Sequence, residues 1–264
     1  MSGYVGSPEQ IALMRRSDDH VDWIRATHGA CNVGRMLGCD DLESMGWPTI
    51  FDALTRDGSF GFRLLSNDAA ALAATELQRH GYRLDLWDVF VADRNAAMAK
   101  VDAILKGGLP AGLSWLELGT DPEGAALRRL QSFMLANGVV PFSGSMLLGR
   151  LVPARTLGIV DVVGRVVASD CAYRPHNNTS VHAHKVWGGL VAVDPSQRGR
   201  RLGVLINAAI VRSAFDELDA DAIYELVSSS NLASRRMVEA CGLRHDPSVV
   251  SGATTPVDGA RYTR

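Results

Sequence analysis

The segment Arg198–Gly203 (RGRRLG) contains three arginines and two glycines, a composition suited to binding an anion. It follows the apolar run 191–193 and precedes a long stretch of apolar residues at helical spacing. The first N–H groups of a helix have no partner inside the helix, and the helix dipole favours an anion beside them. Gly199 and Gly203 let a ligand approach the backbone closely. The segment therefore predicts a phosphate or pyrophosphate site, with a turn that carries solvated arginines as the alternative.

Apolar periodicity predicts the elements that would position this segment. We expect a strand over residues 182–193, which Pro195 ends because proline has no N–H for a strand ladder. A helix is predicted over 199–218, followed by a strand over 222–227 and a helix over 233–240. The segment has neither the GxxxxGK[ST] of a P-loop nor the GxGxxG of a dinucleotide-binding fold. The two commonest nucleotide-binding folds are therefore disfavoured.

The chain also shows one candidate domain boundary. The stretch 106–112 (KGGLPAG) interrupts it between two α/β-like parts. We predict an N-terminal α/β domain over residues 1–108, which carries no chemical motif of its own, and a C-terminal domain over 112–264. The C-terminal domain should also contain a helix over 121–137, two strands within 156–173, and a pair of short strands at its end.

Composition narrows the class of protein. The 264 residues are 47% apolar, enough for a sizeable core, and a net charge of -2 argues against a nucleic-acid binder. No apolar run approaches the roughly 20 residues that span a bilayer, and the first residues do not resemble a secretory signal. The four cysteines are scattered, without CxxC or zinc-ligand spacing. We therefore expect a cytoplasmic protein with reduced thiols, no metal, and no nucleic-acid or membrane partner.

In these segments the sequence resembles the GNAT superfamily of N-acyltransferases. The family pattern V-x-V-x-P-x-x-R/Q-x-x-G-x-G/A is matched by Val191, Val193, Pro195, Arg198 and Gly203. Its first glycine is replaced by Arg201, a departure that helical backbone angles would tolerate. The second family pattern, N-x-x-A/S…G-F/L, is matched by Asn231, Ser234, Gly242 and Leu243. The resemblance covers roughly residues 115–264.

The resemblance implies a mixed, mostly antiparallel α/β (α+β) sheet flanked by helices, with acetyl-coenzyme A or another acyl-coenzyme A as co-substrate. Backbone groups of Val191 and Val193, with Ala192 between them, would pair with the pantetheine arm. Asn231 and Ser234 would lie beside that arm. The residues implied at the pyrophosphate are Arg198, Gly199, Arg200, Arg201, Leu202 and Gly203.

Acyl transfer to an amine also needs a base, because alkyl amines have pKa values near 10. Family members often carry, at the position of Val238, a tyrosine that acts as the acid for the leaving thiolate. This acid is missing here. Tyr224 is the candidate to replace it, unless it is a core or surface tyrosine. The base candidates are His184 and Glu225; the alternatives are an exposed or satisfied histidine and a surface ion pair. Trp187 is expected to form a wall of the acceptor pocket, or to pack in the core.

We therefore expect transfer of an acetyl or short acyl group to a primary amine of a small molecule. A protein N-terminus or lysine as acceptor, a non-catalytic acyl-coenzyme A-binding module, and an unrelated nucleotide-binding protein are the alternatives. The N-terminal part is expected to pack near the acceptor entrance, either as a degenerate copy of the same fold or as another α/β domain. The oligomeric state stays open between a monomer and a homodimer.

Overall fold

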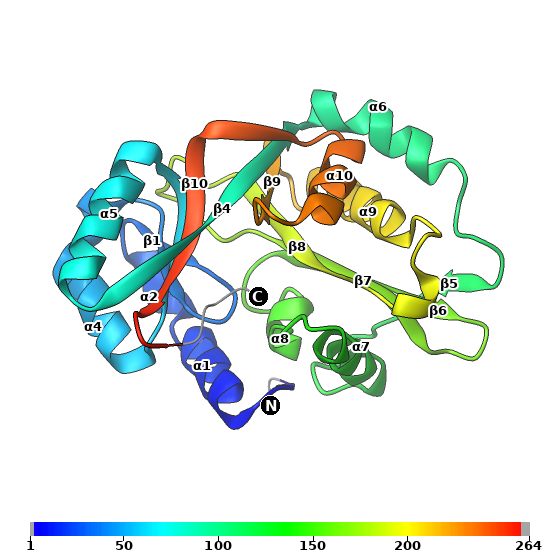
Figure 1. Cartoon of the computed structure of the whole chain (residues 1–264). Coiled ribbons are helices and arrows are strands. Elements are labelled where there is room, and N and C mark those ends of the chain that lie inside the picture. Colours follow the sequence, from blue (N-terminus) through cyan, green and yellow to red (C-terminus); the bar gives the residue numbers. More distant parts are fainter. Residues whose placement is uncertain (1–2, 260–264) are drawn as a thin grey trace.

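The computed structural model describes residues 3–259, and ten strands within them form one sheet (Figure 1). The strands are β1 (Ala30–Asn32), β2 (Leu37–Cys39), β3 (Phe60–Ser66), β4 (Tyr82–Asp93), β5 (Leu113–Trp115), β6 (Ala154–Asp161), β7 (Val166–Tyr173), β8 (Lys185–Val193), β9 (Ala222–Val227) and β10 (Arg244–Pro256). Their order is β1-β2-β3-β10-β4-β9-β8-β7-β6-β5. All neighbouring pairs are antiparallel except β2–β3 and β8–β9. The expected mixed, mostly antiparallel sheet is confirmed.

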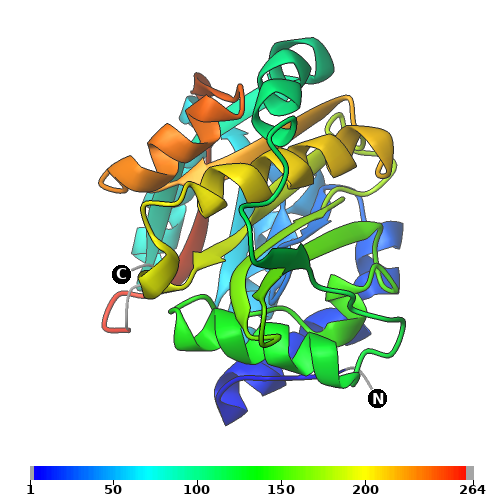
Figure 2. The same cartoon turned by 90° about the vertical axis from the view of Figure 1, so that its right-hand side faces the viewer.

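Helices cover both faces of this sheet. They are α1 (Pro8–Asp19), α2 (Val21–Ala26), α3 (Leu42–Met45), α4 (Trp47–Asp57), α5 (Asn67–Arg79), α6 (Arg94–Leu105), α7 (Ala125–Ala136), α8 (Gly144–Leu147), α9 (Leu202–Asp216) and α10 (Leu232–Ala240). Figure 2 shows α6 and α9 on one face of the sheet and α7 on the other. The apolar side chains of α6, α9 and α10 pack on the first face, and those of α7 and α8 on the second. No helix within residues 3–259 is long and apolar enough to cross a membrane.

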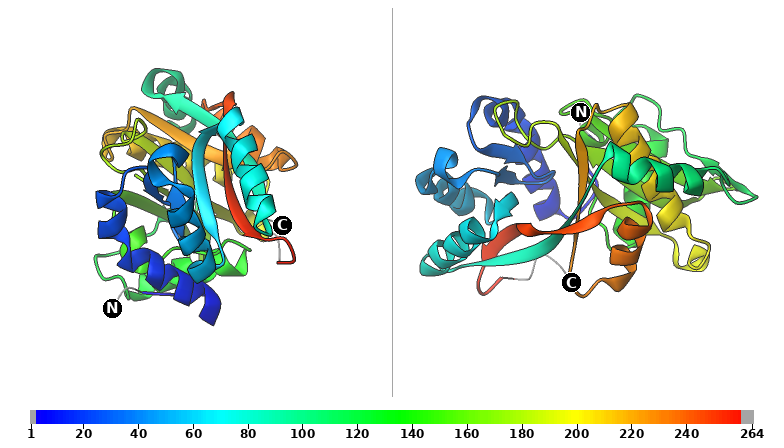
Figure 3. Two further views of the ribbon diagram at one scale, coloured as in Figure 1. Left: turned by 90° about the vertical axis from the view of Figure 1, so that its left-hand side faces the viewer. Right: turned by 90° about the horizontal axis from the view of Figure 1, so that it is seen from above.

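The sheet runs without a break through both predicted domains. β4, from the N-terminal part, pairs with β9 on one side and with β10 on the other. β10 in turn pairs with β3, so this strand, from the C-terminal part, lies within the N-terminal part of the sheet. Figure 3 shows α4 and α5 packed beside these strands. The predicted boundary at 106–112 falls between α6 and β5, and the division into two domains stays a prediction.

Several predicted element bounds differ from the structure. The expected pair of short strands at the end is wrong, because 13 residues form the single strand β10, whose register shifts absorb the irregularity. The helix expected from residue 121 begins at Ala125, since Asp121 accepts a hydrogen bond from the Glu123 N–H in a turn before it. β8 begins at Lys185, because the Ser180 hydroxyl accepts the His182 N–H and holds the preceding residues in a turn.

β8 and β9 run parallel only for a short distance. Their pairing ends at Gly188 opposite Glu225, and the rest of β8 continues to Val193 beside β7 alone. Leu190 has φ 66°, and residues 190–191 lie opposite the single residue Asp170 of β7. This is a β-bulge, which adds a residue to one strand and bends it. The sheet therefore opens between β8 and β9 just after Gly188.

The turn between β8 and α9 contradicts our expectation for Arg201. Arg201 is the N-cap of α9 and has φ 60° and ψ 21°, in the left-handed region rather than at helical angles. Gly199 has φ 80° in the same turn. Arg201 therefore adopts the backbone conformation that favours glycine, at a cost for an L-residue. This left-handed turn also explains why α9 begins at Leu202 and not at residue 199.

We expect Arg201→Gly to be more stable than Arg201→Ala by about 1 kcal/mol, because only glycine adopts φ 60° without strain. Arg200, which has no positive φ, provides the control: there alanine should be as stable as glycine or more so. Urea unfolding midpoints of the four variants measure the difference. The same order at both positions would contradict the left-handed turn.

Candidate active site

A cavity of about 360 Å³ lies where β8 and β9 separate. Its walls come from β4, β8, β9, α10 and two loops. The lining residues are Arg35, Trp87, Gly138, Val139, Val140, Trp187, Gly188, Gly189, Leu190, Val191, Glu225, Leu226, Val227, Ser234, Met237 and Val238. Four of the predicted site residues thus meet in one place: Trp187, Val191, Glu225 and Ser234.

Two glycines keep this cavity open. A Cβ on Gly189 would lie 2.5 Å from Cζ2 and Cη2 of Trp187, closer than atoms can approach. A Cβ on Gly188 would lie 3.2 Å from Cγ of Glu225, a tight contact with a flexible side chain. Trp187 therefore lies over Gly189, where its ring lines the cavity and also packs in the core. The sequence pattern Trp-Gly-Gly is explained by this packing rather than by a turn.

Beyond Gly188, no strand within residues 3–259 pairs with the open side of β8. The N–H of Asp194 donates to the Val167 carbonyl of β7, and backbone groups alternate in direction along a strand. Val191 and Val193 therefore direct their N–H and C=O groups toward the gap between β8 and β9. An extended ligand can pair there as an added strand.

The arginine-rich turn leads from this gap to the start of α9. Arg198, Gly199, Arg200 and Arg201 are exposed, and Arg200 donates to the Gln197 side chain at 2.5 Å. By contrast, the side chains of Ala192 and Leu202 are buried in the core, so only their backbones can contact a ligand. A Cβ on Gly203 would make ordinary contacts of 3.4 Å with Sδ of Met237 and 3.6 Å with Cγ2 of Val193. The start of α9 thus packs against β8 and α10, with its free N–H groups at the turn.

Asn231 and Ser234 lie at the start of α10. The Asn231 side chain accepts the Ser234 N–H at 3.0 Å, so Asn231 is the N-cap of this helix. Ser234 lines the cavity, whereas Asn231 is exposed beside it. The cap therefore fixes the start of α10, with Ser234 in its first turn at the cavity.

Glu225 is a buried carboxyl group at the point where the strands part. One oxygen, Oε1, accepts a hydrogen bond from the Asn207 amide of α9 at 2.9 Å. Burial raises the pKa of Glu225 to about 7, although the Asn207 hydrogen bond opposes the shift. Burial also raises the pKa of the neighbouring Asp170, and the charge of Glu225 adds to that increase. A carboxyl group in a cavity with a pKa near neutrality is suited to accept a proton.

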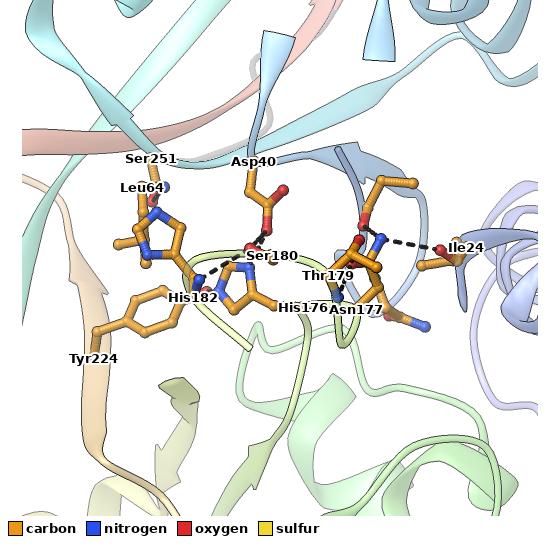
Figure 4. A network of polar contacts seen from close by, with 12 residues as sticks. Ile24, Asp40, Leu64, His176, Asn177, Thr179, Ser180, His182, Tyr224 and Ser251 are labelled. Atoms are coloured by element: carbon orange, nitrogen blue, oxygen red, sulfur yellow. Dashed lines mark hydrogen bonds and ion pairs between the residues drawn. The ribbon is translucent and has the colours of Figure 1, made fainter. Parts of the chain in front are cut away.

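Tyr224 and His184 do not line the cavity. Tyr224 is fully buried on the opposite face of the sheet from Glu225, and its hydroxyl lies 3.2 Å from Nε2 of His176. Nδ1 of His176 lies 2.5 Å from a carboxylate oxygen of Asp40, which also accepts from Ser180 (Figure 4). His184 is exposed before β8, and its carbonyl accepts the Asp221 N–H at 3.0 Å. Neither side chain is placed to reach a ligand in the cavity.

The Asp40–His176–Tyr224 network joins the N-terminal and C-terminal parts of the chain. Burial lowers the pKa of His176, the Asp40 contact opposing the shift, so the ring is neutral at pH 7. A neutral ring that donates from Nδ1 to Asp40 accepts a hydrogen bond from the Tyr224 hydroxyl at Nε2. Sequence reasoning did not single out Asp40, since 136 residues separate it from His176.

Two further lining residues, Arg35 and Trp87, were also missed from the sequence. Trp87 is on β4, and Arg35 is in the loop between β1 and β2. Their positions depend on the strand order, which places β4 directly beside β9. No motif or spacing could have identified them.

Comparisons with known proteins agree with this geometry. The sequence profile of the acetyltransferase (GNAT) family matches residues 151–243. No curated protein matches the chain in sequence. Among solved structures, a GCN5-related N-acetyltransferase from Kribbella flavida is similar with a TM-score of 0.56 at 14% identity, over 94% of this chain and 96% of that one. A Drosophila protein has a TM-score of 0.58 at 14% identity, over 97% of this chain and 92% of that one.

A tandem GNAT protein from the clavulanic acid biosynthesis pathway is similar with a TM-score of 0.50 at 14% identity, over 87% of this chain and 78% of that one. Likenesses at this identity establish the fold. The chain thus has the fold of the GCN5-related N-acetyltransferases. The match of the family profile to residues 151–243 confirms, for that part of the chain, the resemblance recognised from the two sequence motifs.

We expect Gly189→Ala to destabilise the protein by about 1–3 kcal/mol, because the new methyl group would displace the Trp187 ring. Gly188→Ala is the matched control and should cost less, since the Glu225 side chain can move away. Urea unfolding of both variants, read by tryptophan fluorescence, gives the comparison. Equal stability of the Gly189 variant and the wild type would show that Trp187 does not lie over this glycine.

Proposed function

We propose that this chain is an N-acyltransferase that moves an acetyl or other short acyl group from acyl-coenzyme A to a primary amine of a small molecule. The observation that carries the proposal is the gap between β8 and β9, where the cavity meets the start of α9. The gap offers strand-like backbone pairing, and the start of α9 offers unpaired N–H groups and arginines. An elongated thioester with a pyrophosphate at one end has groups complementary to both.

The donor would lie along β8. Val191 and Val193 would pair with the pantetheine amides, and the turn from Arg198 to Gly203 would hold the pyrophosphate. Ser234 would contact the arm from α10, because it lines the same cavity. This orientation leaves the thioester beside Gly188 and Glu225, where the two strands separate.

The reaction would proceed by direct attack of the amine on the thioester carbonyl. A C–N bond forms, the C–S bond breaks, and Glu225 takes the proton that the amine nitrogen loses. An N–H group of the bulge in β8 is available to the carbonyl oxygen as negative charge develops there. The thiolate then receives the proton, or leaves without one, since a thiol pKa is only about 8.5. Val238, at the position of the family tyrosine, supplies no acid.

A non-catalytic acyl-coenzyme A-binding module is the second candidate. The observation that favours it is the absence of a hydroxyl donor at Val238 and the burial of Tyr224 away from the cavity. The raised pKa of the cavity-lining Glu225 favours the enzyme. Release of coenzyme A in the presence of amines distinguishes the two.

Acetyl-coenzyme A should raise the melting temperature of the protein. At a concentration 100 times its Kd, the ligand contributes about 2.7 kcal/mol of stability. Arg198→Glu should reduce the shift, because it replaces a cation at the turn with an anion. Arg129→Glu makes the same change on exposed α7, on the other face of the sheet, and should leave the shift unaltered. No shift with the wild type would contradict donor binding itself.

Glu225→Gln should lower kcat by about 10²–10⁴-fold, the usual contribution of a general base. In the wild type, kcat/KM should rise with pH and level off above about 7, because the carboxylate is the active form above its pKa. The glutamine variant should lose this rise. Glu239→Gln, on the exposed side of α10, should keep both the rate and the profile. Retention of the pH profile by Glu225→Gln would exclude Glu225 as the base.

A further inference from the structure

We propose that the amine acceptor carries a carboxylate, which Arg35 and Trp187 bind at the cavity wall while the buried Arg63 adds positive charge from beside the Trp187 ring. These three residues are called the donor cluster below, because their side chains carry N–H hydrogen-bond donors; the name does not refer to the acyl donor. The inference rests on the proposed acyl transfer and adds the chemical class of the acceptor, an amino acid. It depends on three observations at and around Trp187.

Arg63, on β3, is a buried cation without an acidic neighbour. Arg63 is only 6% exposed. Among residues 3–259, no acidic side chain lies within 4 Å of its guanidinium group. Its polar neighbours are the hydroxyls of Tyr173 and Tyr224, which carry no charge at pH 7. Its Nε has no hydrogen-bond partner in the part of the chain that the structure describes. A buried guanidinium stays charged, so an anion is the ligand that would complete its environment.

Trp187 provides a second donor without an acceptor. Its indole Nε1 is buried and has no hydrogen-bond partner within the described residues, although the ring lines the cavity. The side of the ring next to Nε1 faces Gly189, because a Cβ there would lie 3.3 Å from Cε2. The guanidinium carbon of Arg63 is 5.9 Å from the centre of this ring. Buried indole N–H groups usually have a partner, so this one marks a place for an acceptor atom.

Arg35 adds a cation at the cavity wall. Its Nη1 donates to the Val140 carbonyl at 2.5 Å, and its guanidinium carbon lies 5.7 Å from the centre of the Phe142 ring. Phe142 also contacts Trp187, with ring centres 5.9 Å apart. Arg35 and Trp187 thus line the same cavity, and Arg63 lies beside the Trp187 ring without lining the cavity itself.

The chemistry of this end selects a carboxylate. The donor cluster offers N–H groups and positive charge, whereas the single carboxyl group among the lining residues, Glu225, accepts from Asn207 on the other face of the sheet. A carboxylate is a planar acceptor that matches guanidinium N–H pairs. The cavity of about 360 Å³ must also hold the acyl end of the donor, which favours an acceptor the size of an amino acid. The amine would then lie toward Glu225 and the carboxylate toward the donor cluster.

The test compares amines that differ only in the carboxylate. Coenzyme A release is measured with acetyl-coenzyme A and with pairs such as glycine and glycinamide, β-alanine and β-alaninamide, and 5-aminopentanoate and pentylamine. For the best pair, we expect kcat/KM to be 10–100-fold higher for the acid, the range for hydrogen bonds to a charged group. Equal rates for the members of every pair would overturn the inference.

Two variants locate the site. Arg63→Met removes the buried charge with little change in size, and Trp187→Phe keeps a ring but removes the indole N–H. Each should raise KM for the acid at least 10-fold and KM for the uncharged partner less than 2-fold, with KM for acetyl-coenzyme A unchanged. An equal rise for both partners would contradict the inference. If Arg63→Met does not fold, the same comparison with Trp187→Phe decides.

The outcomes also separate this inference from the proposed function. If no amine releases coenzyme A although acetyl-coenzyme A raises the melting temperature, the acyl-transfer proposal fails. If uncharged amines are acetylated as well as the acids, acyl transfer stands and the carboxylate site is wrong. If Trp187→Phe leaves all KM values within 2-fold, its N–H binds water rather than the acceptor, and the donor cluster is overturned.

Discussion

The separation of β8 and β9 is the constraint on which the candidate site depends. Two parallel strands that stayed paired would satisfy each other's backbone groups and leave no opening in the sheet. The bulge at residues 190–191 bends β8 away, and the left-handed Leu190 is the backbone cost of that bend. Once the strands part, the cavity, the unpaired backbone of β8 and the start of α9 lie in one line. The glycines at 188 and 189 are needed because side chains already occupy the space beside them.

The continuous sheet determines what surrounds this opening. β4 is inserted between β9 and β10, so a strand from the first third of the chain forms part of the cavity wall through Trp87. The loop that carries Arg35 reaches the same wall. Asp40 is connected to the C-terminal part through His176, in a buried network that also includes Tyr224. The N-terminal part therefore contributes to the site and does not merely flank it.

Buried polar groups are distributed on both faces of the sheet at this point. Successive residues of β9 point to opposite faces, so Tyr224 faces His176 and Arg63 while Glu225 faces Asn207 and Asp170. Burial of such charged groups costs free energy, and it raises the pKa of Glu225 to about 7. One strand thereby separates a carboxyl group suited to proton transfer from a cluster of cationic and aromatic groups suited to an anion.

The sequence by itself determined the local features of the proposed donor site. Val191, Arg198, Gly203 and Asn231 were recognisable because the strand, the turn and the two helix starts are local structures with a fixed spacing. The resemblance to the GNAT family also implied the mixed sheet, which the structure confirms. The backbone angle of Arg201 was misjudged, since a residue type does not reveal the left-handed conformation that the bulged strand and α9 impose on it.

Only the tertiary structure decided which side chains meet across the sheet. The order of the strands placed Arg35, Trp87 and Arg63 beside residues more than 100 positions away, and no pattern in the sequence encodes that proximity. It also separated the three catalytic candidates, because Glu225 lies at the cavity, Tyr224 is buried behind it, and His184 is exposed. The physical reason is that hydrophobic periodicity reports which face of a strand is buried, whereas the neighbour that covers this face depends on how the whole chain packs.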